Sequence, residues 1–552
     1  MKKILLTIVC FALAVNLKAQ WTLNPAVNNT VCTASDTQEY PYAISDNKGG
    51  AIIIWEDQRN GFTSTGRDLY AQRVNTSGYA LWQFNGIPIC QQNNSQHMPV
   101  MVPDGNSGVF IAWVDMRPGS HTDIYAQHVD SSGVIQWALN GIAVCNAIEN
   151  QLQVNMVSDG SGGIILTWID NRSGSTNGDI YAQRINAAGI VQWTTNGVPV
   201  STNAANQTYP AIISDPVTHS SIIAWEDKRN GYLDIYAQKI NSAGITQWGA
   251  NDAIVCNASW DQAFPRIVSD GSGGCIVAWL DYRSGIQAYA QKLNASGATQ
   301  WTTNGVLAFS GTTVTAAYNP DAVTNGSGGI IIVFSQRING VDRDLFAQNI
   351  SSSGSVQWGN AGATVAAGIG DQRFASLVVD NLGGVVVAFE DTRNTINNSD
   401  IYIQSLSSSG NSLLPANGLA VCTQTNIQGY PKVVLDNSGG AIVTWWDFRN
   451  TFNSDIYIDR IPLFFTGVKE QQVDEGQIII FPNPSSGSFR IQSPNHLSSI
   501  SYLVSNSLGE VVYQSAMEKS SDTYFDLKLS SGIYFISIIN ASTKITKKLI
   551  VE

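Results

Sequence analysis

The residues of this 552-residue chain that could do chemistry form a repeated Asp-x-Arg motif, which places a carboxylate and a guanidinium two positions apart after an apolar run. Another Asp follows several residues later. Examples are Asp57 with Arg59, Asp115 with Arg117, Asp170 with Arg172, and Asp227 with Arg229. Paired carboxylates near an arginine are used in glycoside hydrolysis. Catalysis needs one such group at one place, however, so the repetition favours ion pairs that hold hairpins together.

A second recurring motif, Gln-x-Tyr-Pro and its variants, begins the first strand-like segment of several units. Its aromatic members are Tyr40, Tyr209, Phe264, Phe374 and Tyr430, each two residues after a glutamine. Such residues should surround one mouth of a central channel, where aromatic faces with amide neighbours stack on sugars and hydrogen-bond to them. The same repetition would also arise if these rings capped hydrophobic cores. Ligand contact and core packing therefore both stay open for these five positions.

The chain offers no further catalytic or metal-binding constellation. It contains no Asp-x-Asp-x-Asp-Gly calcium loop, and its five histidines have neither a metal-ligand spacing nor a partner nucleophile. Ser-Asp pairs at Asp46, Asp159, Asp270 and Asp436 are expected to close turns through hydrogen bonds from side chain to backbone. We therefore predict no catalytic residue, no metal and no cofactor.

These motifs belong to one unit that occurs eight times, at intervals of 54 to 58 residues. The register is set by the aromatic residue that closes each apolar run: Trp55, Trp113, Trp168, Trp225, Trp279, Phe334, Phe389 and Trp445. Each unit has four short segments with the two-residue period of strands, separated by turn residues, and no helical period. Radial stacking buries both faces of such four-stranded sheets. We predict an all-β fold, an eight-bladed β-propeller over residues 20–461.

The two ends of the repeat array indicate how the ring closes. The fourth strand of a unit is expected at the Gly-x-x-x-Trp segment, as at residues 245–248, and the eighth unit lacks this segment. Residues 20–24, Gln-Trp-Thr-Leu-Asn, match residues 192–196 in the third unit. We therefore expect the N-terminal segment to supply the missing strand, which leaves no free sheet edge around the ring.

The N-terminus and the composition indicate an exported protein. Residues 1–19 have two lysines and an apolar run typical of a signal peptide, with cleavage expected between Ala19 and Gln20. No other run is long enough to span a bilayer, and a net charge of -12 argues against nucleic acid as a partner. Five cysteines occupy equivalent places in different units, too far apart for disulfides. These, namely Cys32, Cys90, Cys145, Cys256 and Cys422, and also Cys275, are predicted to be small buried residues.

The C-terminal segment differs in kind from the repeats and follows a linker at residues 462–477. It contains Phe-Pro-Asn-Pro at residues 481–484, Leu-Gly-Glu-Val-Val at 508–512, Leu-Ser-Ser-Gly-Ile-Tyr at 529–534 and a basic strand at 544–551. Residues 478–552 resemble the type A C-terminal sorting domain of the type IX secretion system of Bacteroidetes, and we expect a small Ig-like β-sandwich. The resemblance implies recognition by the secretion machinery at the outer membrane. It also implies removal of the domain, followed by release or by attachment to lipopolysaccharide.

The repeats themselves resemble two propeller families. Their strand order and motifs are similar to TolB-type blades, and a Gly four residues before a Trp is similar to the tryptophan-docking repeat of quinoprotein dehydrogenases. This spacing occurs at Trp82, Trp137, Trp193, Trp248, Trp301 and Trp358, and we expect each ring to be buried at a blade junction. The seventh unit departs with Leu414. No counterpart of a quinone site is found, so neither family's chemistry is carried over.

Units five and six break the repeat and could mark either drift or a surface for a partner. The altered positions are Gln287, Asn325, Gln336, Ile338 and Phe346. Our first hypothesis is a secreted or surface-located, non-catalytic propeller that binds a glycan or a protein. The second is an extracellular hydrolase or lyase that acts on polysaccharide. The third is a structural surface or matrix component. The second would require non-repeated acidic or histidine residues over the channel, and the sequence indicates none.

Overall fold

The computed structural model describes residues 21, 24–60, 66–174, 177–215, 218–309, 320–337, 342–380, 382–395, 398–463, 479–492, 501–506, 511–515, 522–539 and 544–552. The predicted signal peptide, with its cleavage site at Ala19 and Gln20, lies outside these residues, as does nearly all of the predicted linker. The chain divides into unit 1, Met1–Phe465, and unit 2, Thr466–Glu552. The described residues form strands and no helix, so they contain no helix that could cross a membrane.

The described part of unit 1 contains eight four-stranded antiparallel sheets, numbered here in the order of the repeats. Sheet 1 consists of β2 (Gln38–Ser45), β3 (Ala51–Asp57), β4 (Asp68–Val74) and β5 (Ile87–Cys90). Sheets 2 to 4 consist of β6 (Gln96–Pro103), β7 (Val109–Asp115), β8 (Asp123–Val129), β9 (Ile142–Cys145), β10 (Gln151–Ser158), β11 (Ile164–Asp170), β12 (Asp179–Ile185), β13 (Val198–Ser201), β14 (Gln207–Asp215), β15 (Ser220–Asp227), β16 (Asp234–Ile240) and β17 (Ala253–Cys256).

Sheets 5 to 7 repeat this order. They consist of β18 (Gln262–Ser269), β19 (Cys275–Asp281), β20 (Gln287–Leu293), β21 (Val306–Leu307), β22 (Asp321–Thr324), β23 (Ile330–Arg337), β24 (Arg343–Ile350), β25 (Ala363–Ala366), β26 (Gln372–Val379), β27 (Val385–Thr395), β28 (Asn398–Leu406) and β29 (Leu419–Cys422). In each sheet, strands adjacent in sequence are also adjacent in space. This meander is the arrangement that the four short segments of a repeat predict.

Sheet 8 is built from both ends of the repeat array. Its first three strands are β30 (Gln428–Leu435), β31 (Gly440–Asp447) and β32 (Asp455–Pro462), and the fourth is the N-terminal strand β1 (Asn29–Cys32). β1 pairs antiparallel with β32, with Asn29 opposite Ile458. The N-terminal segment thus completes the last sheet, as expected, but with residues 29–32 instead of residues 20–24.

The fourth strand was predicted at the wrong segment in every unit, and the structure shows why. In sheet 4 this strand is β17, whereas the predicted segment 245–248 makes only one isolated bridge, between Ile240 and Thr246. The Asn241 side chain accepts hydrogen bonds from the amides of Ala243 and Ile245 and so bends the chain back over β16. The alternating pattern of this segment therefore reflects a turn that packs on one side, and the paired strand begins later.

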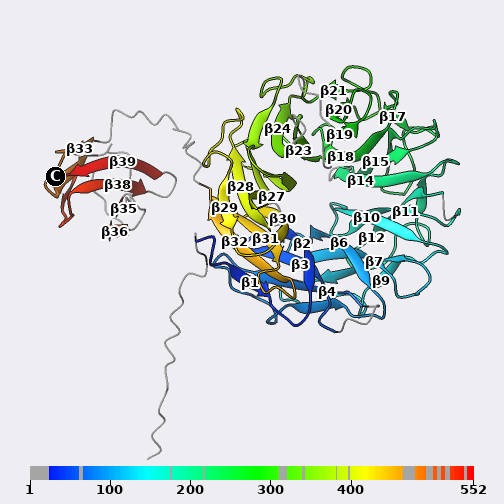
Figure 1. The fold of residues 1–552 in the computed structure, drawn as a ribbon, viewed down its shortest axis with the longest axis horizontal. Helices are drawn as coiled ribbons and strands as arrows, with labels where there is room; N and C mark the ends of the chain where they lie inside the picture. Colours follow the sequence, from blue (N-terminus) through cyan, green and yellow to red (C-terminus); the bar gives the residue numbers. More distant parts are fainter. Residues whose placement is uncertain are drawn as a thin grey trace, which may run out of the picture. The chain divides into compact units, whose positions relative to one another are not determined.

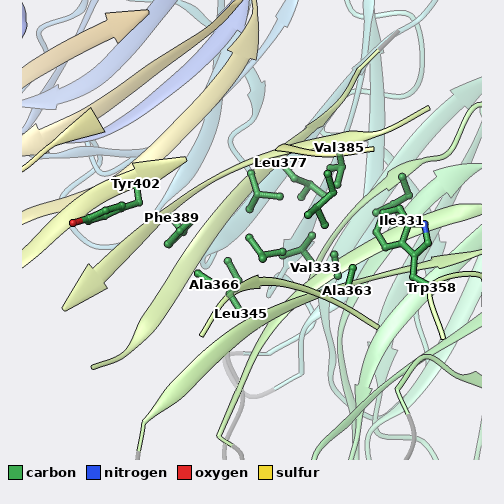
Figure 2. Packing of buried hydrophobic residues seen from close by; sticks show 14 residues of the cluster. Ile331, Val333, Leu345, Trp358, Ala363, Ala366, Leu377, Val385, Phe389 and Tyr402 are labelled. Carbon is green, nitrogen blue, oxygen red and sulfur yellow. The ribbon is translucent and has the colours of Figure 1, made fainter. Parts of the chain in front are cut away.

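The eight sheets have a propeller-like arrangement around one centre. The first strand of each sheet contacts the first strand of the next, and β30 contacts β2. Figure 1 shows the sheets of unit 1 arranged radially, with their first strands innermost. Hydrophobic clusters fill the spaces between neighbouring sheets, as Figure 2 shows for sheets 6 and 7, where Ile331, Val333 and Leu345 face Leu377 and Val385. Each sheet is therefore buried on both faces.

A tryptophan from one sheet docks on the next sheet at seven junctions. Trp193 donates a hydrogen bond from Nε1 to the carbonyl of Ser242 (3.0 Å), and its ring lies 3.0 Å from where a Cβ on Gly244 would be. Gly244 has a φ of +80°, so a side chain there would be strained as well as crowded. The same contact is made by Trp82, Trp137, Trp248, Trp301 and Trp358, and by Trp21 from the N-terminal segment onto Gly78.

Burial of the docking tryptophans is less complete than predicted. Trp82 and Trp358 are buried, whereas the others are only partly buried, because these rings lie toward the outer side of each sheet junction. The seventh unit lacks the tryptophan for an architectural reason. Leu414 packs against a cluster that contains Ile461 and Leu463, and the sequence there, Pro-Leu-Phe-Phe at residues 462–465, replaces the Asn-x-x-Gly of the other units.

Unit 2 contains two sheets around one core. The first has the order β33 (Ile479–Phe481), β34 (Ser488–Gln492), β37 (Asp522–Asp526), and the second has the order β36 (Val511–Gln514), β35 (Ser501–Asn506), β38 (Gly532–Ile539), β39 (Lys544–Val551). Buried side chains from both sheets form a single cluster, including Phe489, Phe525, Tyr502, Ile536 and Leu549. Alternation of buried and exposed residues along β34 shows how these short strands contribute one face to that core.

The two tryptophan classes predict different stability effects. Trp225 closes the apolar run of sheet 4 and is fully buried, whereas Trp193 is partly exposed. We expect Trp225→Ala to destabilise unit 1 by about 3–5 kcal/mol and Trp193→Ala by clearly less. Urea unfolding followed by tryptophan fluorescence measures this in unit 1 alone, since all 15 tryptophans lie before residue 465. If both variants shift the unfolding midpoint equally, Trp225 does not contribute more to packing than Trp193 does.

Candidate functional site

The repeated Asp-x-Arg motif lies inside every sheet except sheet 6, and its side chains are held by contacts within the protein. In sheet 1, Asp57 is fully buried and accepts hydrogen bonds from Trp55 Nε1 (2.7 Å) and Arg59 Nε (2.9 Å). The Arg59 guanidinium lies 3.8 Å from the centre of the Tyr70 ring and donates to the carbonyl of Asn85 (2.8 Å). These contacts join the second and third strands to the segment before the fourth. The motif therefore connects three parts of the sheet, whereas the sequence predicted only a connection between the second and third strands.

In five sheets the motif arginine also reaches the preceding sheet through a cysteine, and Arg229 reaches Ser201 instead. Arg59 Nη2 lies 3.1 Å from Sγ of Cys32, and Arg117 Nη2 lies 3.4 Å from Sγ of Cys90. The cysteines of the described residues are all unpaired and buried, which confirms their predicted packing role. Burial raises the pKa of the Cys32 thiol to about 12, so this group stays protonated and is no nucleophile.

The Ser-Asp turns behave as predicted. Asp46 Oδ1 accepts hydrogen bonds from the amides of Lys48 and Gly50, both at 2.8 Å, and Asp46 Oδ2 pairs with Arg73 (2.8 Å). In sheet 6, Asn325 keeps the same turn and donates to Asn349 (2.8 Å). This altered unit thus replaces an ion pair by a neutral pair of amides.

The third-strand aspartate stands directly opposite the Asp of the motif, which brings two carboxylates together in most sheets. Asp400 pairs across with Asp391, and Asp455 pairs across with Asp447. Burial, assisted by the neighbouring carboxylate, raises the pKa of Asp400 and of Asp455 to about 6. Sheets 5 and 6 keep one carboxylate of the pair, because Gln287 stands opposite Asp281 and Gln336 stands opposite Asp344. Ile338, the remaining altered position at this site, lies outside the described residues.

The first strands of sheets 1 to 5, 7 and 8 share a bulge near their start. At this bulge the backbone has a φ between 49° and 58°, a left-handed conformation that is costly for residues other than glycine. The residues are Tyr40, Met98, Gln153, Tyr209, Phe264, Phe374 and Tyr430. Glutamates of preceding sheets accept their amide hydrogens, as Glu56 does from Met98 (2.9 Å) and Glu390 from Tyr430 (2.8 Å). The conformation is therefore imposed by contacts between sheets.

The five predicted aromatic residues fall into two groups. Tyr430 contacts Tyr40 edge to face, with ring centroids 5.1 Å apart, and stacks on Phe374 at 5.0 Å. Tyr209 and Phe264 form a separate edge-to-face pair at 4.9 Å. Tyr40 and Tyr209 are each 39% exposed and Tyr430 is 37% exposed, so these rings are not core residues. Met98 and Gln153 occupy the same position in sheets 2 and 3, and alignment of the repeats could have found them.

A cavity of about 1060 Å³ opens beside the first of these groups. Its lining comes from sheets 8, 1, 2, 3 and 4 and includes Tyr40 and Tyr430, whereas Tyr209, Phe264 and Phe374 are not among the lining residues. The polar lining comprises Glu56, Arg67, His97, Gln153, Asn171, Asn206, Thr122, Thr208 and Lys432. The structure thus brings two of the five predicted residues together in one concave site, which has the dimensions of a small-molecule or oligosaccharide pocket.

A charged cluster forms one wall of the cavity. Arg67 pairs with Glu56 (2.8 Å) and Glu39 (2.9 Å), and His97 Nδ1 lies 3.3 Å from the Glu56 carboxylate. Burial alone would raise the pKa of Glu56, but hydrogen bonds from His97 and Arg67 outweigh it and hold this pKa below its usual value. Glu39 and His97 depart from the repeat, whereas the position of Glu56 also carries a glutamate in sheets 4 and 7, and all three residues lie on strands. Glu39, Glu56 and Arg67 belong to sheet 1 and His97 belongs to sheet 2, so only the approach of His97 has no local signal in the sequence.

A second exposed aromatic feature lies outside the cavity lining. Tyr232 and Trp260, in loops of sheets 4 and 5, have ring centroids 5.7 Å apart and are 48% and 58% exposed. Trp260 has a φ of +69°, at a position where other sheets have residues such as Asp36, Asn94 and Asn426. Those residues tolerate the left-handed region better than tryptophan does. Trp260 can be recognised as an exception when the repeats are compared, but the sequence analysis did not predict a role for it.

Comparison with known proteins identifies the C-terminal unit. Residues 479–552 match the family described as the secretion system C-terminal sorting domain. The chain is therefore exported by type IX secretion to the cell surface or the extracellular space. Among the described residues, no group of His, Cys, Asp or Glu side chains could hold a metal ion. No curated protein matches the chain by sequence.

Several solved structures are similar to unit 1 at low identity. A protein of unknown function from Dyadobacter fermentans is 11% identical, with 79% of this chain and 98% of that chain covered and a TM-score of 0.39. An ulvan lyase is 11% identical, covering 79% and 96%, with a TM-score of 0.41. The acylaminoacyl peptidase of Pyrococcus horikoshii is 12% identical, covering 74% and 57%, with a TM-score of 0.40. At these TM-scores the likenesses carry no argument about activity.

The raised pKa values of the buried aspartates predict how stability depends on pH. Because the folded-state pKa exceeds the unfolded value of about 4, folding favours the protonated form, and stability falls as pH rises toward 6 and above. We expect Asp455→Asn to stabilise unit 1 at pH 8 by about 1–3 kcal/mol and to give less than half that gain at pH 4.5. Urea unfolding at both pH values measures the difference.

Sheet 5 supplies the reciprocal control for this prediction. Gln287 already occupies the position equivalent to Asp455, so Gln287→Asp should destabilise unit 1 at pH 8 and do so less at pH 4.5. If neither variant changes the pH dependence, the two opposed carboxylates do not repel each other in the folded state.

Proposed function

We propose that unit 1 is an eight-bladed β-propeller, closed by its N-terminal strand, and that it is a non-catalytic binding module whose mouth takes up a glycan or protein ligand. Three observations support closure of the ring. β1 pairs with β32, β30 contacts β2, and Trp21 Nε1 donates to the carbonyl of Thr76 at the junction of sheets 8 and 1. A closed ring gives the module a rigid mouth on which side chains from different blades hold fixed positions.

The cavity beside Tyr40 and Tyr430 carries the binding proposal. Both rings are held in a left-handed backbone conformation and remain more than a third exposed, although burial would have stabilised the fold. Exposed aromatic rings beside amides suit a sugar ring, whose C–H face stacks while its hydroxyls hydrogen-bond. Gln153, Asn171 and Asn206 provide such amides in the lining. Backbone strain kept at an exposed site is a feature typical of ligand-binding positions.

One observation favours the alternative, an extracellular hydrolase or lyase that acts on polysaccharide. The cluster of Glu56, His97 and Arg67 combines a carboxylate, an imidazole and a guanidinium in the same cavity. Such groups can move a proton and stabilise negative charge. The Glu56 carboxylate already contacts Arg67, His97 and the amide of Met98. These contacts support a positioning role for Glu56 over a catalytic one. Release of shortened products from a polysaccharide by the purified chain would establish the enzyme instead.

We also propose the finer organisation of export. Residues 1–19 are a signal peptide cleaved between Ala19 and Gln20, residues 462–477 link the propeller to unit 2, and unit 2 is an Ig-like β-sandwich. The two sheets of unit 2 and their common core support this fold. After recognition at the outer membrane, removal of unit 2 leaves the propeller released or attached to lipopolysaccharide.

Substitution of the exposed rings separates binding from packing. We expect Tyr430→Ala to weaken binding at least tenfold, because an aromatic ring that lines the cavity is lost, while the melting temperature changes by only a few degrees. The measurement is a glycan array followed by calorimetric titration of the best ligand. Tyr209→Ala is the matched control, since Tyr209 has the same backbone conformation and exposure but does not line the cavity. A large drop in melting temperature without loss of binding would assign Tyr430 to packing.

Deletion of residues 478–552 tests the role of unit 2 in export. The truncated chain is expected to disappear from the cell surface and the culture medium and to accumulate in the periplasm. Immunoblotting of these fractions measures the distribution. A matched variant, Phe489→Ala, should have a similar but weaker effect, because it opens the buried core of unit 2 and leaves its surface unchanged. Unchanged export of the truncated chain would refute the proposed dependence on unit 2.

A further inference from the structure

We infer that the cavity selects an anionic saccharide and that Lys432 binds its carboxylate or sulfate group. This inference rests on the proposed glycan-binding function and specifies the ligand. Lys432 lies on β30 in sheet 8 and lines the cavity. Among the described residues, no carboxylate forms an ion pair with its ammonium group, and its nearest recorded partner is the Tyr42 ring, whose centre is 5.7 Å from Nζ.

The other cations near the centre of the ring are compensated. Arg67 has Glu39 and Glu56 as partners in the same cavity. Arg266, which occupies the position of Lys432 in sheet 5, lies 3.7 Å from Asp321 of sheet 6. The equivalent position in sheet 6 is Asp321 itself, and the equivalent positions in the remaining five sheets carry no charge: Tyr42, Val100, Asn155, Ala211 and Ser376. Asp321 also attracts the Lys432 ammonium, but its ion pair is with Arg266, so two cations share this one carboxylate.

An ammonium group in this position is costly for the fold. Lys432 is only partly exposed, and withdrawal from water lowers the pKa of its amine. An uncharged side chain, as in sheets 2 to 4, would avoid this cost. The chain as a whole has a net charge of -12, so its overall field repels anions, whereas Lys432 places a cation without an ion-pair partner in the cavity. A bound anion would restore the missing partner, in an environment where a charge-assisted hydrogen bond is strong.

The surroundings of Lys432 favour a sugar as the carrier of the anionic group. The ring of Tyr42 lies beside the ammonium, and Tyr40 and Tyr430 line the same cavity. A pyranose that stacks on one of these rings can place a carboxylate at C5, or a sulfate ester, within reach of the amine. Uronic acids and sulfated sugars share this chemistry. An acidic peptide presents carboxylates without the flat C–H face that aromatic rings bind.

The test uses the purified full chain without its signal peptide and a panel of matched trisaccharides. The panel pairs uronic acid and sulfated trisaccharides with their neutral counterparts, and binding is measured by calorimetric titration. We expect at least one acidic member to bind tenfold or more tightly than its neutral counterpart. The preference should weaken when salt rises from 50 mM to 500 mM, because the ion pair is screened. Comparison of the uronic acid and sulfated members identifies which anion is used.

Variants of Lys432 make the assignment specific. Lys432→Met should remove the preference for the acidic sugar and leave affinity for the neutral one unchanged, whereas Lys432→Arg should retain most of the preference. Lys48→Met is the control, because Lys48 is exposed in the turn between β2 and β3 and does not line the cavity. Melting temperatures verify that each variant folds. Retention of the preference in Lys432→Met would overturn the inference.

The remaining outcomes separate this inference from the proposed function. Equal binding of acidic and neutral sugars would refute anion selection and leave glycan binding intact. Absence of binding to every saccharide, with binding to an acidic peptide that depends on Lys432, would refute the saccharide and assign the site to a protein partner. Absence of binding to any member of the panel and to the peptide would refute both proposals.

Discussion

Each four-stranded sheet of unit 1 can bury its two faces only between two neighbouring sheets, and the rest of the structure depends on this constraint. The buried aromatic residues of the second strands, such as Trp225, fill the space between sheets, and the docking tryptophans fix the outer part of each junction. A row of such sheets would leave two exposed faces at its ends. In the closed ring that we propose, the pairing of β1 with β32 and the docking of Trp21 on Gly78 remove both.

The same constraint explains why most charged residues of the chain have no functional freedom. Asp57 and Arg59 bind the strands of one sheet together, and Arg59 reaches Cys32 of the preceding sheet. Equivalent groups recur in most sheets. A carboxylate that is fully buried, and that already accepts hydrogen bonds from a tryptophan and an arginine, cannot also serve a substrate. Function must therefore come from residues that the repeat does not require.

The sequence was sufficient to predict the features that repeat and insufficient for those that arise between units. The number of repeats, the strand meander and the completion of the last sheet by the N-terminus follow from local patterns. The fourth strand was misplaced because residues 245–248 alternate like a strand, while Asn241 bends them into a turn. The left-handed bulge at Tyr430 was also invisible, since a glutamate of the preceding sheet imposes it. The cavity joins residues that are hundreds of positions apart, such as Lys432 and Tyr42.

Exceptions to the repeat can be sorted by whether a packing or charge partner accounts for them. Leu414 replaces a tryptophan where the sequence of the next unit lacks the Asn-x-x-Gly, and Asn325 is matched by Asn349, so neither requires a ligand. Gln287 relieves the repulsion that two opposed carboxylates would create. Lys432 is accounted for only in part: it places a cation in a partly dry cavity and forms no ion pair there, and the carboxylate that attracts it, Asp321, pairs with Arg266. An exception that costs stability and has no ion-pair partner of its own is the kind of position that selection for a ligand retains.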